Sequence, residues 1–332
     1  MLPVAMVRAN ALLPFVGFLE GNGAPVERLL DDVGLTPDAT ADGERLLPLY
    51  ACLSFLARAA KSEKLPELGL VVGQQTPFEH LGAYARLIRR GETVEQTLNA
   101  LIGAVALHNS GDRLWLSRCG ERVALCHRFA PPLSAGWLQG EMFTVTMMIQ
   151  AVRATVGPGW APEHVRLPAD AAALQKRVEA TLQAPVVCAG DTTAVAFPRL
   201  LLAAPNRGLR PGGEDADDAI SHEAVPAADF AGSVRQTIRA LLSAGHPDIH
   251  RTATAVGLSA RTLQRRLAEV GETYSSLVDR ARFEASVRHL REGDSKLIDI
   301  ASELGYADPA NFTRAFRRWA GMPPRAFRRN PG

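Results

Sequence analysis

The chain has 332 residues, 47% hydrophobic and 22% charged, a composition typical of a globular protein with two or three domains. No apolar run reaches the roughly 18 residues that span a bilayer, and Met1–Asn10 lacks a basic leader and a cleavage site. These features exclude a membrane span and a secretory signal, so we expect a cytoplasmic protein.

The four cysteines are Cys52, Cys119, Cys126 and Cys188, and no two of them form a C-x-x-C pair. The sequence therefore shows no zinc or redox motif, and scattered cysteines suit a reducing cytoplasm. We interpret them as small core residues and expect neither a metal nor another cofactor.

Charge is distributed unevenly along the chain. The segment from Phe230 to Gly332 holds 17 Lys and Arg against 10 Asp and Glu, a net charge of +7. The residues before it hold 20 basic and 25 acidic side chains, a net charge of −5. A basic final third joined to an acidic remainder indicates a nucleic-acid-binding module attached to a second domain.

The first part of the chain predicts a mixture of helices and strands. Thr93 and Gln96 form a capping-box pattern that opens a helix to about His108. Leu114–Cys119 and Arg122–Cys126 are predicted to be a β-hairpin around Gly120. The other predicted helices are Val4–Glu20, Leu47–Ala60, Leu138–Val156 and Ala171–Leu182, and the other predicted strands are His164–Leu167 and Thr193–Phe197.

A linker is predicted over residues 206–226, where Gly, Pro and acidic residues gather without apolar periodicity. The change of charge across this segment favours a domain boundary over a surface loop. We therefore expect an α+β domain over 1–205, which senses a ligand or dimerises, and an all-α domain over 227–332.

Only helices are predicted after the linker, and two short segments repeat one another. Thr252–Ser259 reads TATAVGLS, and Ile300–Ala307 reads IASELGYA, so alanine and glycine recur at the same positions. The predicted helices are Gly232–Ser243, Ile249–Val256, Ala260–Glu269, Tyr274–Arg291, Leu297–Leu304 and Pro309–Trp319.

Each repeat has the residues that a helix-turn-helix unit requires. Gly257 and Gly305 are expected to take the positive φ of the tight turn, and Ser259 and Asp308 to cap the second helices. The predicted core positions of the second helices are Leu263, Leu267 and Val270 in the first unit and Phe312, Phe316 and Trp319 in the second.

The helix predicted over Tyr274–Arg291 is about 27 Å long and carries apolar stripes on two nearly opposite sides. It is suited to pack against both units and to hold their second helices about one DNA turn, near 34 Å, apart. A plain helical bundle with an arginine-rich surface is the alternative. The repeat, the turn glycines and the basic charge together favour DNA binding.

At this point a family resemblance is apparent. Ile298–Arg328, reading IDIASELGYADPANFTRAFRRWAGMPPRAFR, resembles the C-terminal signature of the AraC/XylS regulators, and GLSARTLQRRL resembles their first helix-turn-helix unit. The resemblance implies that both second helices enter the major groove of double-stranded DNA. The residues that it implies for DNA contact are Ser259, Arg261, Thr262, Gln264 and Arg265 in the first unit and Asn311, Thr313, Arg314, Arg317 and Arg318 in the second.

Two departures from the family pattern bear on these units. Thr252 stands where an aliphatic residue is usual, which predicts weaker packing of the first helix. Pro309 and Ala310 open the last recognition helix where polar residues are common. Proline suits a first helical turn, but neither side chain can donate to a base, so we expect weaker base readout by the second unit.

The N-terminal half resembles the arabinose-binding-like domain of one AraC subgroup, through LLDDVGLTP, ELGLVVGQQTPFEHLGAYARLI and GETVEQTLNAL. The resemblance implies a small-molecule effector, a homodimer, RNA polymerase as a partner, and transcription activation with repression as the alternative. Candidate pocket residues are Trp115, Trp137, Met142, Met147 and Met148, and candidate polar ligands are His80, His108 and His127, although both sets also suit a core or a surface.

Two other functions remain open at this stage. The N-terminal domain can serve dimerisation alone. For the expected homodimer, the helix Leu138–Val156 is the candidate contact. The domain can also be an enzyme fused to a DNA-binding module, using Cys126 and His127. Adjacent residues of a strand point to opposite faces, and the chain has no G-x-S-x-G, H-E-x-x-H or phosphate-loop motif, so we do not expect an enzyme.

Overall fold

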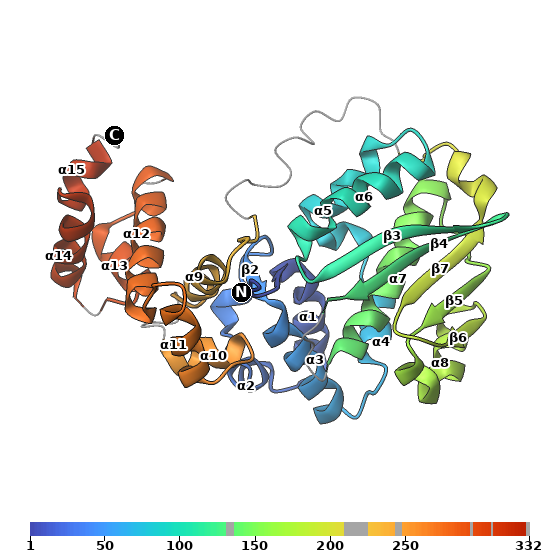
Figure 1. The fold of residues 1–332 in the computed structure, drawn as a ribbon, viewed down its shortest axis with the longest axis horizontal. Helices are drawn as coiled ribbons and strands as arrows, with labels where there is room; N and C mark the ends of the chain where they lie inside the picture. Colours follow the sequence, from blue (N-terminus) through green and yellow to red (C-terminus); the bar gives the residue numbers. More distant parts are fainter. Residues whose placement is uncertain (131–135, 209–224, 243–247, 293–294, 307, 330–332) are drawn as a thin grey trace.

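The computed structural model describes residues 1–130, 136–208, 225–242, 248–292, 295–306 and 308–329. Figure 1 shows an N-terminal part in which helices surround a sheet and a C-terminal part built from helices alone. The predicted α+β domain followed by an all-α domain is therefore confirmed. Within the described residues, no helix is long and apolar enough to cross a membrane.

The main sheet has five strands in the order β3-β4-β7-β5-β6. The predicted hairpin is confirmed, with Asp112 opposite Phe129 at its open end and Cys119 opposite Arg122 at its turn. β5 and β6 are parallel, and the other pairs are antiparallel. The strands are β3 (Asp112–Cys119), β4 (Arg122–Phe129), β5 (His164–Leu167), β6 (Val186–Cys188) and β7 (Thr193–Pro198), of which β6 was not predicted.

The chain start differs from the predicted helix. Met6–Arg8 is a strand, β1, which pairs with β2 (Leu46–Pro48) in a second, two-stranded sheet. The helix begins only at α1 (Leu13–Gly21). The prediction was wrong over the first residues because pairing with a segment about forty residues away, which local periodicity does not reveal, satisfies the backbone there.

The helix α7 (Trp137–Val156) lies at the centre of the N-terminal domain, between the sheet and the helices α3 and α4. Most of its apolar residues are buried by the chain itself, and Met142, Val145 and Val152 are fully buried. The expectation that this helix offers a dimer contact is therefore wrong. The other helices of this domain are α2 (Val26–Asp31), α3 (Leu49–Ser62), α4 (Leu68–Gln75), α5 (Ala83–Arg86), α6 (Val94–His108) and α8 (Gln175–Leu182).

The C-terminal helices form a core of their own, in which Leu263, Leu277, Phe312 and Phe316 are fully buried. The six predicted helices are present, and Pro324–Arg329 forms a seventh among the described residues. They are α9 (Phe230–Leu241), α10 (Ile249–Ala255), α11 (Ala260–Ala268), α12 (Tyr274–Glu292), α13 (Leu297–Glu303), α14 (Pro309–Ala320) and α15 (Pro324–Arg329).

The two parts are packed together through the first C-terminal helices. Ala240, Leu241 and Ala255, from α9 and α10, belong to the N-terminal core. In Figure 1, α9 and α10 lie beside the N-terminal domain, whereas α13–α15 lie at the far end of the molecule. Most of the predicted linker, residues 209–224, falls outside the described residues. Its first residue, Asn206, is buried in the N-terminal domain, where its Nδ2 donates to Ile88 O at 2.6 Å.

Candidate functional site

The first repeat folds as a helix, a glycine turn and a second helix, as predicted. Gly257 has φ 71°, and Leu258 N donates to Ala253 O at 2.8 Å to close the turn. Ser259 caps α11, because its Oγ accepts from Thr262 N at 3.1 Å. Ser259 and Thr262 thus hold the N-terminal end of the helix that is expected to meet DNA.

The second repeat has the same hydrogen-bonding pattern. Gly305 has φ 74°, and Tyr306 N donates to Ala301 O at 2.9 Å. Asp308 caps α14 by accepting from Ala310 N at 2.8 Å. The sequence repeat is therefore a structural repeat down to its turn hydrogen bonds.

One face of α11 is exposed and polar. Arg261, Gln264 and Arg265 are exposed, while Leu263 and Leu267 on the opposite side are fully buried. Arg265 Nη1 forms an ion pair with Glu269 Oε1 at 2.6 Å, one turn further along the helix. This face has the side chains that major-groove readout requires.

The exposed face of α14 is also basic, but more of its side chains bind within the chain. Arg314 donates to the Asn311 side chain, and Arg318 Nη2 pairs with Asp279 Oδ2 at 2.8 Å. Thr313 is half-buried, and its hydroxyl donates to Pro309 O at 2.9 Å. Arg317 is exposed. All ten predicted contact residues thus lie on α11, α14 or the cap of α11.

One expectation about the core of the first unit was wrong. Val270 is 46% exposed, because α11 ends at Ala268 and Gly271, with φ 74°, turns the chain away. The weaker packing expected at Thr252 stays a prediction, although the side chain finds a place in the core. It is fully buried, and its hydroxyl shares a 2.8 Å hydrogen bond with the hydroxyl of Tyr274.

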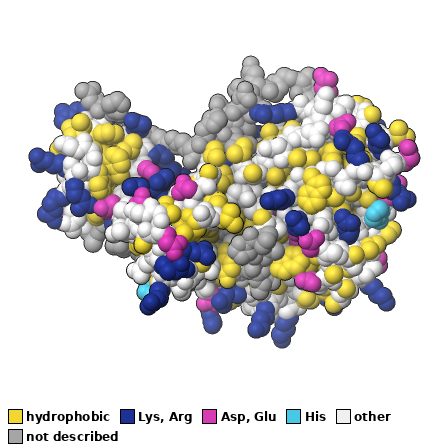
Figure 2. All heavy atoms as spheres, viewed as in Figure 1, with side chains coloured by type: hydrophobic (Ala, Val, Ile, Leu, Met, Phe, Trp, Pro, Cys, Tyr) yellow, Lys and Arg dark blue, Asp and Glu magenta, His cyan; other side chains and the backbone are white. Residues whose placement is uncertain are grey.

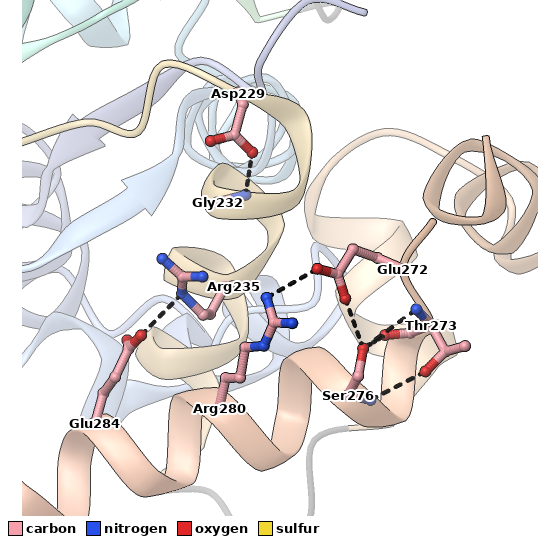
Figure 3. Close-up of polar contacts among 8 residues, drawn as sticks. All are labelled: Asp229, Gly232, Arg235, Glu272, Thr273, Ser276, Arg280 and Glu284. Atoms are coloured by element: carbon pink, nitrogen blue, oxygen red, sulfur yellow. Dashed lines mark hydrogen bonds and ion pairs between the residues drawn. The ribbon is translucent and has the colours of Figure 1, made fainter. Parts of the chain in front are cut away.

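The helix α12 connects the two units, and polar contacts hold its first half (Figure 3). Thr273 Oγ1 accepts from Ser276 N at 3.2 Å, and Glu272 Oε1 pairs with Arg280 at 2.8 Å. Arg235 of α9 pairs with Glu284 of α12 at 3.2 Å. The predicted apolar stripes of α12 are confirmed, since residues on both sides of it belong to the C-terminal core. These residues are Leu277, Ala281, Ala285, Phe283, Val287 and Leu290.

Lys and Arg side chains gather on the outer edge of the C-terminal lobe, on the left of Figure 2. Arginine supplies 16 of the 17 basic residues after residue 229. Its planar guanidinium group binds phosphate and guanine in a bidentate manner. The lobe that presents the two second helices is therefore the basic one.

The N-terminal domain contains a cavity of about 110 Å³. Its wall is mostly apolar and includes Phe15, Leu53, Leu56, Met147 and Met148. Of the five predicted pocket residues, only these two methionines line it. Met142 is core, Trp115 is 37% exposed and Trp137 is half-buried.

A buried polar cluster lies at one side of this cavity. Glu141 and His127 are both fully buried, with His127 Nδ1 and Glu141 Oε2 2.9 Å apart. The same carboxylate accepts from the Thr193 hydroxyl at 2.5 Å, and His127 Nε2 lies 3.4 Å from Asp112 Oδ1. Burial alone lowers the pKa of His127, but the charges of Glu141 and Asp112 outweigh it and raise this pKa to about 10. The two neighbouring carboxyl groups thus favour the protonated form of His127.

The other two candidate histidines differ from His127 in their surroundings. His108 is buried and stacks on Tyr84 with ring centroids 4.8 Å apart. Burial, followed by the charge of Arg8, lowers the pKa of His108 to about 3, so its ring is neutral. His80 is exposed. Sequence reasoning missed Asp112 and Glu141 altogether, since neither belongs to a motif.

The proposed cysteine–histidine pair is not assembled. Leu125, His127 and Phe129 line the cavity, whereas Cys126, which lies between them on β4, does not. The Cys126 thiol instead lies 3.6 Å from Ala124 O. This alternation along the strand agrees with the expectation that the two side chains point to opposite faces.

Comparison with known families identifies the family of the chain. The arabinose-binding domain found at the N-terminus of AraC transcription regulators matches residues 23–206, which is more than half of the chain. The chain belongs to the AraC family of transcription regulators. A helix-turn-helix domain matches residues 252–330 of this AraC-type regulator. The two matches together describe a DNA-binding regulator with an N-terminal ligand-binding domain.

Several curated regulators are similar to this AraC-type chain. The HTH-type transcriptional regulator VirS of Mycobacterium tuberculosis is 24% identical over 98% of this chain and 96% of VirS. The regulator VqsM of Pseudomonas aeruginosa is 37% identical, over 29% of this chain and 31% of VqsM. The ornithine utilization regulator of the same species is 36% identical, over 26% of this chain and 25% of its own length. The chain thus matches under a third of the length of the last two.

Among solved structures, the chain is similar to the transcriptional regulator CdpR from Pseudomonas aeruginosa. The identity is 22%, the match covers 92% of this chain and 96% of CdpR, and the TM-score is 0.40. The relatives named above carry the names of regulators and not of enzymes.

Proposed function

We propose that this AraC-type regulator binds double-stranded DNA through the exposed faces of α11 and α14, and that a small molecule in the N-terminal cavity controls this binding. The proposed contact residues are Ser259, Arg261, Thr262, Gln264, Arg265, Asn311, Thr313, Arg314, Arg317 and Arg318. Their support is their position on two equivalent helices of a basic lobe. Residues 1–205 then act as the sensor, 206–226 as the linker and 227–332 as the DNA-binding domain.

The finer features of this function follow from the family resemblance. We propose a cytoplasmic homodimer that activates transcription through contacts with RNA polymerase. Two-fold assembly is the common way to read repeated half-sites, which supports a dimer. Because α7 is buried, the dimer has to use another surface of the chain.

The observation that carries effector control is the position of α3. One side of this helix lines the cavity through Leu49, Cys52, Leu53 and Leu56. Tyr50, which follows Leu49 in the same helix, contacts the DNA-binding domain. A Cβ atom placed on Gly257 would lie only 2.8 Å from the Tyr50 ring, so the ring packs directly on the turn between α10 and α11. A single rigid helix thus joins the cavity wall to the first helix-turn-helix unit.

Further contacts hold the same unit against the N-terminal domain. Arg251 of α10 forms an ion pair with Asp31, and its Nη1 donates to Leu35 O at 3.3 Å. A Cβ on Gly34 would lie 2.6 Å from Arg251 O, so the two backbones are in close contact. These contacts give the first unit a docked state whose equilibrium a ligand can shift.

The second unit makes no comparable contact in the part of the chain that the structure describes, since α13–α15 lie at the far end of the molecule (Figure 1). Control through docking would therefore act on the first recognition helix. That helix carries Arg261, Gln264 and Arg265, whose long side chains can reach base edges. The unit that docks on the N-terminal domain would then also be the unit that reads the bases.

A cavity-filling variant tests effector control. Leu56→Phe enlarges a side chain of α3 that points into the cavity and should mimic a bound ligand. We expect its DNA affinity to differ from that of the unmodified chain by at least about fivefold, the lower end of typical allosteric coupling. The measurement is fluorescence anisotropy on a sequence selected from a random pool.

Leu200→Phe is the matched control, because Leu200 is 81% exposed and the chemical change is the same. It should leave the DNA affinity unchanged. If folded Leu56→Phe also binds DNA as the unmodified chain does, the N-terminal domain does not control DNA binding through this cavity. That outcome would favour the alternative in which the domain only dimerises.

A further inference from the structure

The strand β3 has a free edge along its whole length. It is an outer strand of the main sheet, and all eight of its residues are paired with β4 on one side only. No other described segment pairs with it, and Figure 1 shows it at the border of the sheet with α6 alongside. Edge strands are commonly blunted by a proline or a bulge. β3 has neither, so this edge is open to pairing with another chain.

The hydrogen bonds of the hairpin show which main-chain groups of β3 are free. Ala130 N donates to Gly111 O at 2.7 Å, so these two opposite residues form a hydrogen-bonded pair. Such pairs alternate along an antiparallel ladder, so every second residue from Arg113 onward bonds to β4. The N–H and C=O groups of Leu114 and Leu116 therefore point to the free edge. Outside the sheet, no described residue bonds to them.

A two-fold arrangement of two β3 strands centred on Trp115 joins these free groups. Leu114 then lies opposite Leu116 of the second copy, and the N–H and C=O of each can bond to the other. An axis at Arg113 would place two arginines opposite each other, which is destabilising. An axis at Ser117 would place Leu114 opposite the hairpin turn. The arrangement centred on Trp115 is therefore the self-complementary one.

The side chains of the outer sheet face suit the same arrangement. Trp115 is 37% exposed, although it is a large aromatic residue. On the axis it would pack against Trp115 of the second copy, and cross-strand aromatic pairs are stabilising. Arg113 would lie opposite Ser117, so no like charges meet. Partly exposed tryptophans of this kind are enriched in protein interfaces.

The helix α6 adds an uncharged surface beside this edge. Glu95, at its start, pairs with Arg118 near the end of β3, and the exposed positions of the helix continue from there at helical spacing. These exposed positions are Gln96, Asn99, Gly103 and Ala106. None of them is charged, and interface cores are depleted of charged residues. Side chains as small as Gly103 and Ala106 let a second helix approach closely.

We propose that this regulator dimerises by antiparallel pairing of the β3 edges of two copies, with Trp115 at the two-fold axis and the α6 helices alongside. This inference rests on the proposed function, in which the chain is a homodimer, and names the surface that forms it. One continuous sheet would then run through both copies. Because α14 lies at the other end of the molecule from β3, this pairing leaves it uncovered (Figure 1).

Sedimentation velocity on the full chain tests the interface. Trp115→Arg places two like charges at the axis, so the dissociation constant of the dimer should rise by at least about tenfold. Val187→Arg is the matched control, because Val187 is 51% exposed and lies in the same row of paired residues, on the opposite edge strand β6. It should leave the dimer unchanged. Equal effects of the two substitutions overturn the proposal.

Disulfide formation tests the register without relying on a weakened dimer. In a chain with Cys119→Ser, one sample carries Arg113→Cys and another carries Ser117→Cys. Opposite residues between the hydrogen-bonded pairs have Cα atoms about 4.5 Å apart, which a disulfide can bridge. After subunit exchange and mild oxidation, the mixture should give a covalent dimer. Either sample alone should give no more than the Cys119→Ser chain, and equal yields from the mixture and the separate samples contradict the register.

The unmodified chain distinguishes this inference from the proposed function. A monomer at micromolar concentration, with and without DNA, overturns both the interface and the homodimer. A dimer that persists in folded Trp115→Arg and gives no disulfide between positions 113 and 117 overturns the interface alone. If Trp115→Arg does not fold, the disulfide experiment still decides, because it keeps Trp115.

Discussion

The contact between Tyr50 and the turn at Gly257 makes a quantitative prediction about Gly257→Ala. Gly257 has φ 71°, and an alanine in this left-handed region costs about 1–2 kcal/mol. The added Cβ would also lie 2.8 Å from three atoms of the Tyr50 ring. Overpacking of this kind costs about 1–3 kcal/mol. We therefore expect Gly257→Ala to destabilise the folded, docked chain by about 2–5 kcal/mol in total.

Two further variants separate these contributions. Gly271→Ala is the matched control, because Gly271 has φ 74° but no atom within 4 Å of its built Cβ. It should therefore lose only the backbone contribution. In a Tyr50→Ala background the ring is gone, so Gly257→Ala should cost no more than Gly271→Ala. The double-mutant cycle should give a coupling of about 1–3 kcal/mol between positions 50 and 257.

Urea unfolding of the full chain, followed by far-ultraviolet circular dichroism, measures these free energies. Amide exchange in α3 and α10 is followed in parallel, because separation of the two domains can relieve the clash without global unfolding. The reasoning is refuted if Gly257→Ala and Gly271→Ala behave alike and Tyr50→Ala changes neither stability nor exchange.

Two other predictions concern base readout and pH. Arg265→Ala should reduce the preference for particular bases by about 1–3 kcal/mol, measured on sequences selected from a random pool. Arg314→Ala should weaken binding by a similar factor on all sequences. If both variants lose the preference at particular bases, both units read sequence. Burial, followed by the charge of Arg8, lowers the pKa of His108 to about 3 in the folded chain. Near pH 6 the histidine is therefore protonated in the unfolded chain but not in the folded chain. Stability should therefore be lost as pH falls below about 6.5, by up to about 1.4 kcal/mol per pH unit. In urea titrations between pH 7 and 5, His108→Gln should remove this part of the slope and His80→Gln, at an exposed position, should keep it; identical slopes would contradict the prediction.

Local patterns in the sequence were sufficient for the DNA-binding domain. A turn glycine, a capping side chain and apolar residues at helical spacing act within a few residues of one another. The roles of Gly257, Ser259 and Leu263 could therefore be predicted from the local sequence. The same reasoning failed at Val270, where the apolar spacing continued past the end of the helix. Periodicity indicates which face is apolar, but it does not show where the helix stops.

Only the tertiary structure decided the features that depend on distant segments. The start of the chain is a strand because Met6–Arg8 pairs with Leu46–Pro48, and this distant pairing overrides the local helical pattern. Glu141 meets Thr193 across 52 residues of sequence, and Tyr50 meets Gly257 across the domain boundary. A single acidic residue or tyrosine belongs to no sequence motif, so its spacing does not predict which residue it contacts in the fold. The N-terminal cavity and its connection to the first helix-turn-helix unit therefore emerge only when the sheet, α3 and α7 are packed together.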